Sequence, residues 1–233
     1  MSVWAVVPAA GSGRRFGADI PKQYLDLEGK PLLGHVLELL LRAPGIDAMV
    51  LVTAAADTRW RALLPDPAPR PVFNAEGGAT RAASVLSALE VLREHARSDD
   101  WVLVHDAARP CLHAGDLANL METLKDDAVG GLLAAPVVDT LKRADEQGRA
   151  AGTQDRSGLW RALTPQMFRY ELLLNALRGA LMAGIEVTDE ACAIEWAGHK
   201  PLLVSGGIDN VKVTRPEDLP LAAAIMRSRM IKS

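Results

Sequence analysis

The sequence contains only two cysteines, and this scarcity excludes several kinds of site. Cys111 and Cys192 lie far apart, neither belongs to a Cys-x-x-Cys pair, and neither falls in a Cys/His array with the spacing of metal ligands. A disulfide framework and a cysteine-based metal centre are therefore not expected. We interpret both residues as free thiols of a reducing compartment.

Long apolar segments and an excess of positive charge are also missing. The longest apolar run, residues 36–41, is interrupted by Glu38 and is far shorter than the roughly 20 apolar residues that cross a bilayer. Residues 1–8 have no basic flank and no apolar region of signal length, so we expect a cytoplasmic protein without a membrane partner. The formal net charge of -3 provides no general basic field, so a nucleic-acid partner is not expected.

What the chain does contain is the composition of a globular protein. Hydrophobic residues make up 49% of its 233 residues, which is enough for a large core. Short runs rich in Val and Leu alternate with segments of helical periodicity. The runs are residues 3–7, 48–53, 101–105 and 131–138, and the helical segments include 85–92 and 173–181. We predict one α/β domain over residues 1–233, with a Rossmann-like, mostly parallel sheet and helices on both faces.

Residues 137–155 interrupt this alternation. Val137, Val138 and Leu141 form a strand-like run, and a polar stretch with one glycine, Gly148, follows them. The pattern predicts a projecting β-hairpin arm. On the residues alone, the arm is either a solvated surface hairpin or a contact between subunits.

The most informative stretch, Pro8-Ala9-Ala10-Gly11-Ser12-Gly13, follows the first apolar run directly. Its small residues let backbone N–H groups approach a polyanion. It is not the dinucleotide fingerprint, because no Gly follows Gly-x-Gly at the required position, and it is not a Walker loop, because Gly-Lys-Ser/Thr is missing. Two cations, Arg15 and Lys22, come soon after it, which favours stabilisation of a phosphoryl group during transfer.

A later apolar run ends in a carboxylate, Asp106. The carboxyl end of a parallel strand lies at the ligand crevice, where a hard oxygen ligand for Mg2+ is needed beside a triphosphate. The alternative is a helix cap or a surface ion pair with Arg109. We interpret the adjacent His105 as a packed, hydrogen-bonded neighbour and not as a catalytic base.

Two further stretches are weak signals when taken singly. Residues 77–84 form a glycine turn that leads into a helix, which is either a ligand-binding turn or a plain strand-to-helix connection. Residues 205–216 place Asp209 and Lys212 in a polar turn and short strand before a terminal helix. Neither stretch assigns a function by itself.

Taken together and in order, these stretches resemble the motifs of the 2-C-methyl-D-erythritol 4-phosphate cytidylyltransferase family, a group of glycine-rich-loop nucleotidyltransferases. The motifs are Pro-Ala-Ala-Gly-Ser-Gly-Arg-Arg with Pro-Lys-Gln-Tyr, Gly-Gly-x-x-Arg-x-x-Ser, Val-His-Asp-Ala-Ala-Arg-Pro, Ala-Pro-Val-x-Asp-Thr-Leu-Lys, Leu-Thr-Pro-Gln, Val-Thr-Asp-Glu and Asp-Asn-Val-Lys-Val-Thr-Arg-Pro. The resemblance covers nearly the whole chain. The sequence departs from it at Ala79 and Thr80, where some relatives carry acidic residues.

The resemblance implies transfer of CMP from CTP to 2-C-methyl-D-erythritol 4-phosphate in non-mevalonate isoprenoid biosynthesis, with Mg2+ as cofactor and a homodimer with shared active sites. It also implies a role for each site residue. The implied catalytic residues are Arg15, Lys22, Arg156 and Lys212. The nucleotide would contact Ala9, Ala10, Gly11, Ser12, Gly13, Gly78, Arg81 and Ser84. The acceptor would contact Arg109, Thr140, Arg156, Thr164, Thr188 and Lys212, with Arg109 and Thr140 supplied by the neighbouring subunit. The metal ligands would be Asp106 and Asp209.

Two rival interpretations share the loop and the strand-end carboxylate. A ribitol-5-phosphate cytidylyltransferase ranks second, because residues 155–160 and 163–166 look more like the methylerythritol enzyme. A non-catalytic nucleotide-binding module of the same fold would not need Arg15, Lys22 and Asp106 together. Release of pyrophosphate distinguishes an enzyme from such a module.

Overall fold

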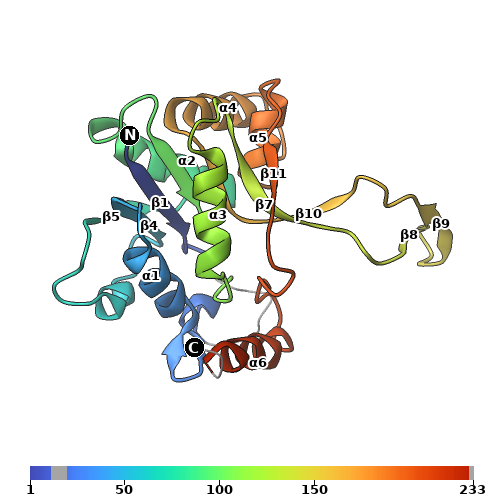
Figure 1. Cartoon of the computed structure of the whole chain (residues 1–233), viewed down its shortest axis with the longest axis horizontal. Helices are drawn as coiled ribbons and strands as arrows, with labels where there is room; N and C mark the ends of the chain where they lie inside the picture. Colours follow the sequence, from blue (N-terminus) through green and yellow to red (C-terminus); the bar gives the residue numbers. More distant parts are fainter. Residues whose placement is uncertain (12–19, 231–233) are drawn as a thin grey trace.

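A seven-stranded sheet organises the molecule, which is described by a computed structural model over residues 1–11 and 20–230 (Figure 1). The strand order is β11-β7-β10-β6-β1-β4-β5. These strands are β1 (Val3–Pro8), β4 (Ala48–Thr53), β5 (Val72–Glu76), β6 (Trp101–Val104), β7 (Gly130–Pro136), β10 (Trp160–Arg169) and β11 (Leu202–Ser205). Neighbouring strands run parallel except where β10 pairs antiparallel with β6 and β7. The predicted mostly parallel sheet is confirmed.

Helices cover both faces of this sheet and bury the apolar runs between them. α1 (Leu32–Arg42) and α3 (Ala114–Leu124) share one core with Ala5 and Val7 of β1. α2 (Arg81–Val91), α4 (Tyr170–Met182) and α5 (Glu190–Trp196) share the other core with Val6. Successive side chains of a strand point to opposite faces, so an uninterrupted apolar run is what a doubly covered strand requires.

A third, smaller core joins the C-terminal helix to the segment that follows the glycine-rich stretch. α6 (Asp218–Met230) contributes Ala222 and Ala223, which pack with Leu27 and Val213. The short elements of this segment and of the connections are η2 (Lys22–Tyr24), β2 (Asp26–Leu27), β3 (Lys30–Pro31), η3 (Arg59–Leu63) and η4 (Leu92–Glu94). The third core therefore brings the Val213 segment beside the Lys22 segment, far apart in the sequence.

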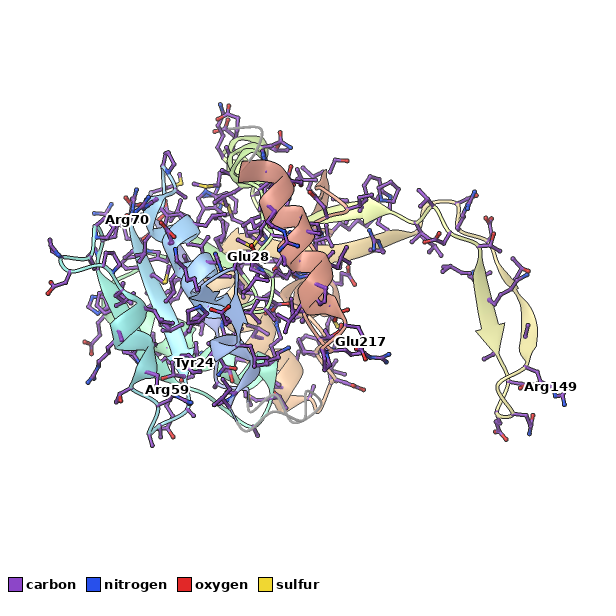
Figure 2. All side chains as sticks on the ribbon, turned by 90° about the horizontal axis from the view of Figure 1, so that it is seen from below. Tyr24, Glu28, Arg59, Arg70, Arg149 and Glu217 are labelled. Atoms are coloured by element: carbon purple, nitrogen blue, oxygen red, sulfur yellow. The ribbon has the colours of Figure 1, made fainter. Side chains whose placement is uncertain are left out.

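The predicted hairpin arm is present as a separate two-stranded antiparallel sheet. Its strands are β8 (Leu141–Ala144) and β9 (Ala150–Gln154), and Arg149 lies near its outer end (Figure 2). The arm projects well away from the body (Figure 1), and β9 is exposed along its whole length.

β10 was not among the strands predicted from the sequence, and it contains Pro165, which has no N–H to donate to a neighbour. The structure accommodates the proline with a shift of register between Ala162 and Gln166 in the pairing with β7. Irregular pairing of this kind removes the need for one ladder hydrogen bond. In the part of the chain that the structure describes, no helix has the length and apolar character needed to span a membrane.

Candidate active site

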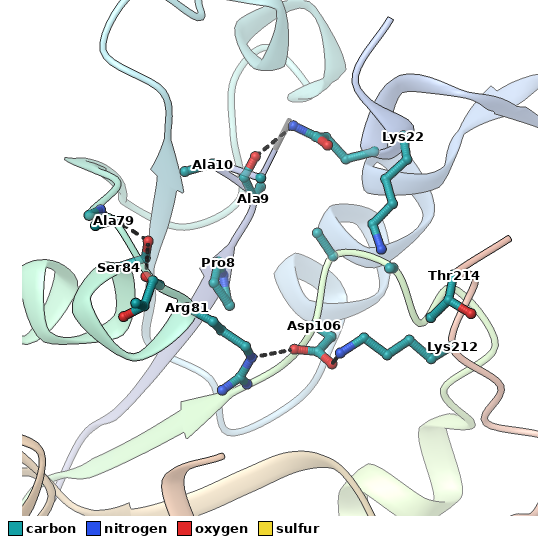
Figure 3. Close-up of a pocket in the computed structure, with 16 residues that line it drawn as sticks. Pro8, Ala9, Ala10, Lys22, Ala79, Arg81, Ser84, Asp106, Lys212 and Thr214 are labelled. Atoms are coloured by element: carbon teal, nitrogen blue, oxygen red, sulfur yellow. Dashed lines mark hydrogen bonds and ion pairs between the residues drawn. The ribbon is translucent and has the colours of Figure 1, made fainter. Parts of the chain in front are cut away.

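A cavity of about 660 Å³ opens at the carboxyl ends of β1 and β6 (Figure 3). Segments from across the sequence line it. They are residues 8–11, 22–23, 78–81, Ser84, residues 106–108, Lys212 and Thr214. This is the position at which open α/β sheets bind ligands. The predicted crevice therefore exists, and it collects residues from four of the motif regions.

The glycine-rich stretch forms one wall of the cavity. The Gln23 side chain, which is buried, donates from Nε2 to the carbonyl oxygen of Ala9 at 2.6 Å. Lys22 lies at the cavity and donates from Nζ to the carbonyl oxygen of Val213 at 3.2 Å. Ala9, Ala10 and Gly11 line the cavity as predicted. Ser12, Gly13 and Arg15 lie outside the described residues, so their roles stay predictions.

The opposite wall is the turn that enters α2. The Ser84 hydroxyl donates to the Thr80 carbonyl at 2.9 Å and accepts from the Gly78 N–H at 3.1 Å. A Cβ atom at Gly77 would lie 2.1 Å from the Ala10 Cβ, so only glycine allows this close approach to the other wall. Both hydrogen bonds of the Ser84 hydroxyl therefore stabilise the turn. Ser84 contributes to recognition of a base only by fixing the conformation of the backbone at Gly78.

The structure also assigns a local role to Thr80, where the chain departs from some relatives. Its side chain caps α2 by accepting a hydrogen bond from the Ala83 N–H at 3.1 Å. This contact satisfies one of the N–H groups that a helix leaves unpaired at its start. Thr80 therefore shapes the same turn as Ser84.

Asp106 lies at the cavity between cations from three segments. Its Oδ1 is 2.9 Å from Arg81 Nε, and its Oδ2 is 2.7 Å from Lys212 Nζ and 3.6 Å from Arg109 Nε. Burial by itself raises the pKa of Asp106, but the attraction of Arg81 and Lys212 outweighs it and holds the pKa well below its usual range. The carboxylate is therefore ionised and aimed at the cavity.

Arg81 links Asp106 to a residue that the sequence reasoning did not single out, Glu190. The Arg81 Nη1 and Nη2 atoms lie 2.6 Å and 3.0 Å from the two carboxylate oxygens of Glu190, which is completely buried. Burial opposes the charge on Arg81, but the two carboxylates outweigh it and raise the pKa of Arg81. The only signal in the sequence was the position of Glu190 in the Val-Thr-Asp-Glu motif.

Behind Asp106 lies a buried polar layer within the same chain. Thr164 Oγ1 accepts from the Asp106 N–H at 3.2 Å and lies 2.9 Å from His105 Nδ1. Burial lowers the pKa of His105 to about 4, so the imidazole is neutral, as expected for a packed neighbour. Neither Thr164 nor His105 is among the residues that line the cavity.

Arg109 is also held within its own chain. Its side chain is 12% exposed, and Nη1 donates to the Asn210 carbonyl at 2.7 Å while Nε lies beside Asp106. Nη1 thus has a hydrogen-bond partner in the same chain, whereas the buried Nε has none among the described residues. The expectation that Arg109 reaches the acceptor of a neighbouring subunit stays a prediction. Within a single chain, Arg109 supports the loop of residues 209–212.

The remaining predicted acceptor residues lie away from the cavity of their own chain. Thr140 belongs to the exposed arm, and Arg156 follows the arm directly and donates to the carbonyl of Val138. Thr188 is exposed just before α5. Of the acceptor residues predicted from the sequence, Lys212 alone lines the cavity.

The two predicted metal ligands have different surroundings. Asp106 faces the cavity, whereas Asp209 pairs with Arg229 Nη2 at 2.6 Å and is absent from the cavity lining. Among the described residues, no group of three or more His, Cys, Asp or Glu side chains could hold a metal ion. Mg2+ is commonly held by one or two carboxylates plus substrate phosphates. Asp106 beside the glycine-rich stretch fits such a site, and the role of Asp209 as a second ligand stays a prediction.

Comparisons with known proteins agree on one family. Residues 3–228 match the family model described as IspD: 2-C-methyl-D-erythritol 4-phosphate cytidylyltransferase. A relative of that name from Hahella chejuensis is 48% identical over 98% of this chain and 94% of its own length. Another from Pseudomonas putida (strain GB-1) is 55% identical over 93% of this chain and 92% of its own length.

Solved structures give the same result. A crystal structure of 4-diphosphocytidyl-2C-methyl-D-erythritol synthase matches with a TM-score of 0.84 and 39% identity, and the match covers 97% of this chain and 98% of that one. The 2-C-methyl-D-erythritol 4-phosphate cytidylyltransferase of Thermus thermophilus matches with a TM-score of 0.79 and 30% identity, over 97% of this chain and all of that chain.

Proposed function

We propose the function of this chain from one premise: it belongs to the 2-C-methyl-D-erythritol 4-phosphate cytidylyltransferase family. The proposed reaction is transfer of CMP from CTP to 2-C-methyl-D-erythritol 4-phosphate, a step of non-mevalonate isoprenoid biosynthesis. The observation that carries it is the cavity itself, which joins the glycine-rich stretch to Asp106 and Lys212. A small-residue wall and a cation-flanked carboxylate suit a triphosphate undergoing substitution.

The chemistry requires alignment and charge neutralisation from the protein. A phosphate oxygen of the acceptor forms a bond to the α-phosphorus of CTP, and the bridging bond to the β-phosphate breaks. Pyrophosphate leaves with the electron pair, so no covalent enzyme intermediate is needed. In this proposal Lys22 and Lys212, which both line the cavity, stabilise the charge that builds up on the phosphoryl oxygens.

The two walls have separate tasks in this proposal. Backbone N–H groups of Ala10 and Gly11 hold the triphosphate beside Ala9, whose own N–H donates to the Val52 carbonyl, and Ser12, Gly13 and Arg15 are added from the sequence motif. The Gly78 turn, held by Ser84, lines the same cavity as Ala10 and is the wall that the cytosine base would contact. Mg2+, when bound by Asp106 and phosphate oxygens, would neutralise negative charge on the triphosphate.

The acceptor side suggests a homodimer with shared sites. Thr140 lies on the arm and Arg156 follows it directly, both outside the cavity of their own chain. Val138, within the arm, is 69% exposed, and Leu159 and Trp160 are exposed at the base of the arm. Apolar residues on a projecting hairpin are poorly covered in a monomer, and a second copy would cover them. The free thiols of Cys111 and Cys192 fit a cytoplasmic location.

The test is release of pyrophosphate with each nucleoside triphosphate crossed against 2-C-methyl-D-erythritol 4-phosphate and ribitol 5-phosphate. We expect turnover with CTP and the methylerythritol acceptor, and little with other pairs. Turnover with ribitol 5-phosphate instead would identify the sibling enzyme. Nucleotide binding without pyrophosphate from any pair would identify a non-catalytic module.

A further inference from the structure

Glu190 has a side chain that the local structure of α5 does not need. The N-terminus of α5 is capped by Asp189, whose Oδ1 accepts from the Cys192 N–H at 2.9 Å. Glu190 follows the cap, is completely buried, and directs both carboxylate oxygens to Arg81. A helix start would be equally well formed with another residue at this position, so the role of Glu190 lies in its contact with Arg81.

Stability is a weak explanation for this contact. Removing two charges from water carries a large desolvation cost, and a buried ion pair often contributes no more than apolar residues of the same size. The pair does, however, fix geometry. Glu190 takes Arg81 Nη1 and Nη2, which leaves Nε directed at Asp106 Oδ1. The plane of the guanidinium is therefore set by Glu190.

The first turn of α5, which carries Glu190, is held firmly against the sheet. Gln166 on β10 is buried, donates from Nε2 to Asp189 Oδ2 at 2.9 Å, and accepts from the Ala191 N–H at 2.8 Å. These two bonds lock the first turn of α5 against β10. Because the backbone at Glu190 is fixed in this way, its carboxylate holds Arg81 within a narrow range of positions.

The charges around Asp106 indicate that Glu190 prevents Arg81 from pairing with both carboxylate oxygens of Asp106. Arg81, Arg109 and Lys212 surround Asp106, and Glu190 offsets one of these three positive charges. Without Glu190, Arg81 has only Asp106 as a carboxylate partner among its described ion pairs. Guanidinium groups favour two-pronged pairing with carboxylates, so Arg81 would turn and occupy both oxygens of Asp106.

We propose that Glu190 is a positioning residue for nucleotidyl transfer, which acts through Arg81 to keep the Asp106 carboxylate oriented and available at the cavity. The proposal rests on the proposed function, in which Asp106 serves the triphosphate and its cation. Glu190 is not among the residues that line the cavity. Its effect is confined to the direction of Arg81 and therefore of Asp106.

The test compares Glu190→Gln with Glu195→Gln, the same substitution at an exposed position on the same helix. Glu190→Gln keeps the shape but removes the charge that holds Arg81. We expect kcat to fall roughly 10- to 100-fold, as for a small misplacement of a reacting group, with much less change in the KM for CTP. Mn2+ titrations in the presence of CTP, read by electron paramagnetic resonance without acceptor, should show weaker Mn2+ binding. The control should match the parent in all three.

A second variant covers the case in which Glu190→Gln does not fold. Arg81→Lys keeps the positive charge but cannot bridge Glu190 and Asp106 in a fork, so it should show the same loss of kcat and of Mn2+ binding. The double variant should be little worse than either single one, because both break one linkage. Lower thermal stability with unchanged kcat and unchanged Mn2+ binding would overturn the proposal. A parent protein that binds CTP with Mn2+ but releases no pyrophosphate would refute the proposed function, while the Mn2+ comparison would still test Glu190.

Discussion

Lys212 Nζ lies 2.7 Å from Asp106 Oδ2, so the last motif of the chain meets the strand-end carboxylate at the cavity. Arg81 holds the other oxygen of Asp106 from the opposite side. The carboxylate is thus flanked by two cations from segments that are far apart in the sequence. These two cations determine the effect expected when Asp106 is substituted.

Asp106→Asn should lower kcat by roughly 100-fold or more and raise the Mg2+ concentration needed for half-maximal activity. A neutral amide is a poorer ligand for a hard cation, and it also leaves Arg81 and Lys212 without their partner. Pyrophosphate release measured across a Mg2+ titration checks this. Asp99→Asn, at an exposed position, is the matched control. An unchanged Mg2+ dependence would rule out direct ligation by Asp106.

Lys22→Ala should lower turnover by roughly several orders of magnitude while changing CTP affinity much less, because its contact strengthens as charge builds on the α-phosphate. The sequence motif predicts the same for Arg15→Ala. Steady-state kinetics together with calorimetric CTP binding separate the two effects, and the exposed Lys200→Ala serves as control. Weaker CTP binding with intact turnover would show Lys22 to be an ordinary phosphate clamp.

Ser84→Ala should raise the KM for CTP and reduce the free energy of unfolding by about 1–2 kcal/mol, because the Gly78 N–H and the Thr80 carbonyl both lose a partner. Ser87→Ala, on the same helix and partly exposed, should do neither. Kinetics with CTP and with UTP, combined with denaturant unfolding, measure both effects. If the KM for CTP stays constant, the Gly78 turn does not shape the base pocket.

Mixing two damaged chains tests whether sites are shared. If the arm of one subunit completes the cavity of the other, a mixed dimer of Lys22→Ala and Thr140→Ala chains has one intact site and one doubly damaged site. Activity should therefore reappear after the two variants are refolded together. The design requires that each variant alone is strongly impaired and that mixed dimers are confirmed by native mass spectrometry. Activity no higher than that of the parents would refute the shared-site arrangement.

The two thiols should differ sharply in reactivity. Cys111 is completely buried, and burial raises the pKa of its thiol to about 11 from 9.0, so about one part in a thousand is thiolate at pH 8. The buried neutral thiol also favours the folded state up to about pH 9, and this contribution is lost as pH rises towards 11. A chromogenic disulfide reagent should label Cys192 first and Cys111 only on unfolding. Cys111→Ala should flatten the fall in stability between pH 9 and 11.

Several features followed from local sequence alone. Runs such as residues 48–53 must be strands covered on both faces, because they offer no polar side for water, and β4 occupies that range. The hairpin arm followed from the polar stretch with Gly148, and the crevice residues Ala9 and Asp106 followed from their place at strand ends. The periodicity of apolar residues, the residue types of a turn and the position of a residue at a strand end each depend on a few neighbouring residues. They can therefore be predicted without knowledge of the tertiary structure.

Other features depended on contacts between distant segments, which only the tertiary structure determines. Pro165 sits in a central strand because an irregular pairing with β7 removes the need for its N–H. Asp209 pairs with Arg229 on α6, and Arg109 is held by Asn210 within its own chain, so each has a partner that the motifs did not reveal. Glu190 reaches Arg81 because α5 and α2 pack on the same face of the sheet. A short sequence pattern carries no information on which partner a buried charge will meet, because packing of the helices against the sheet makes that choice.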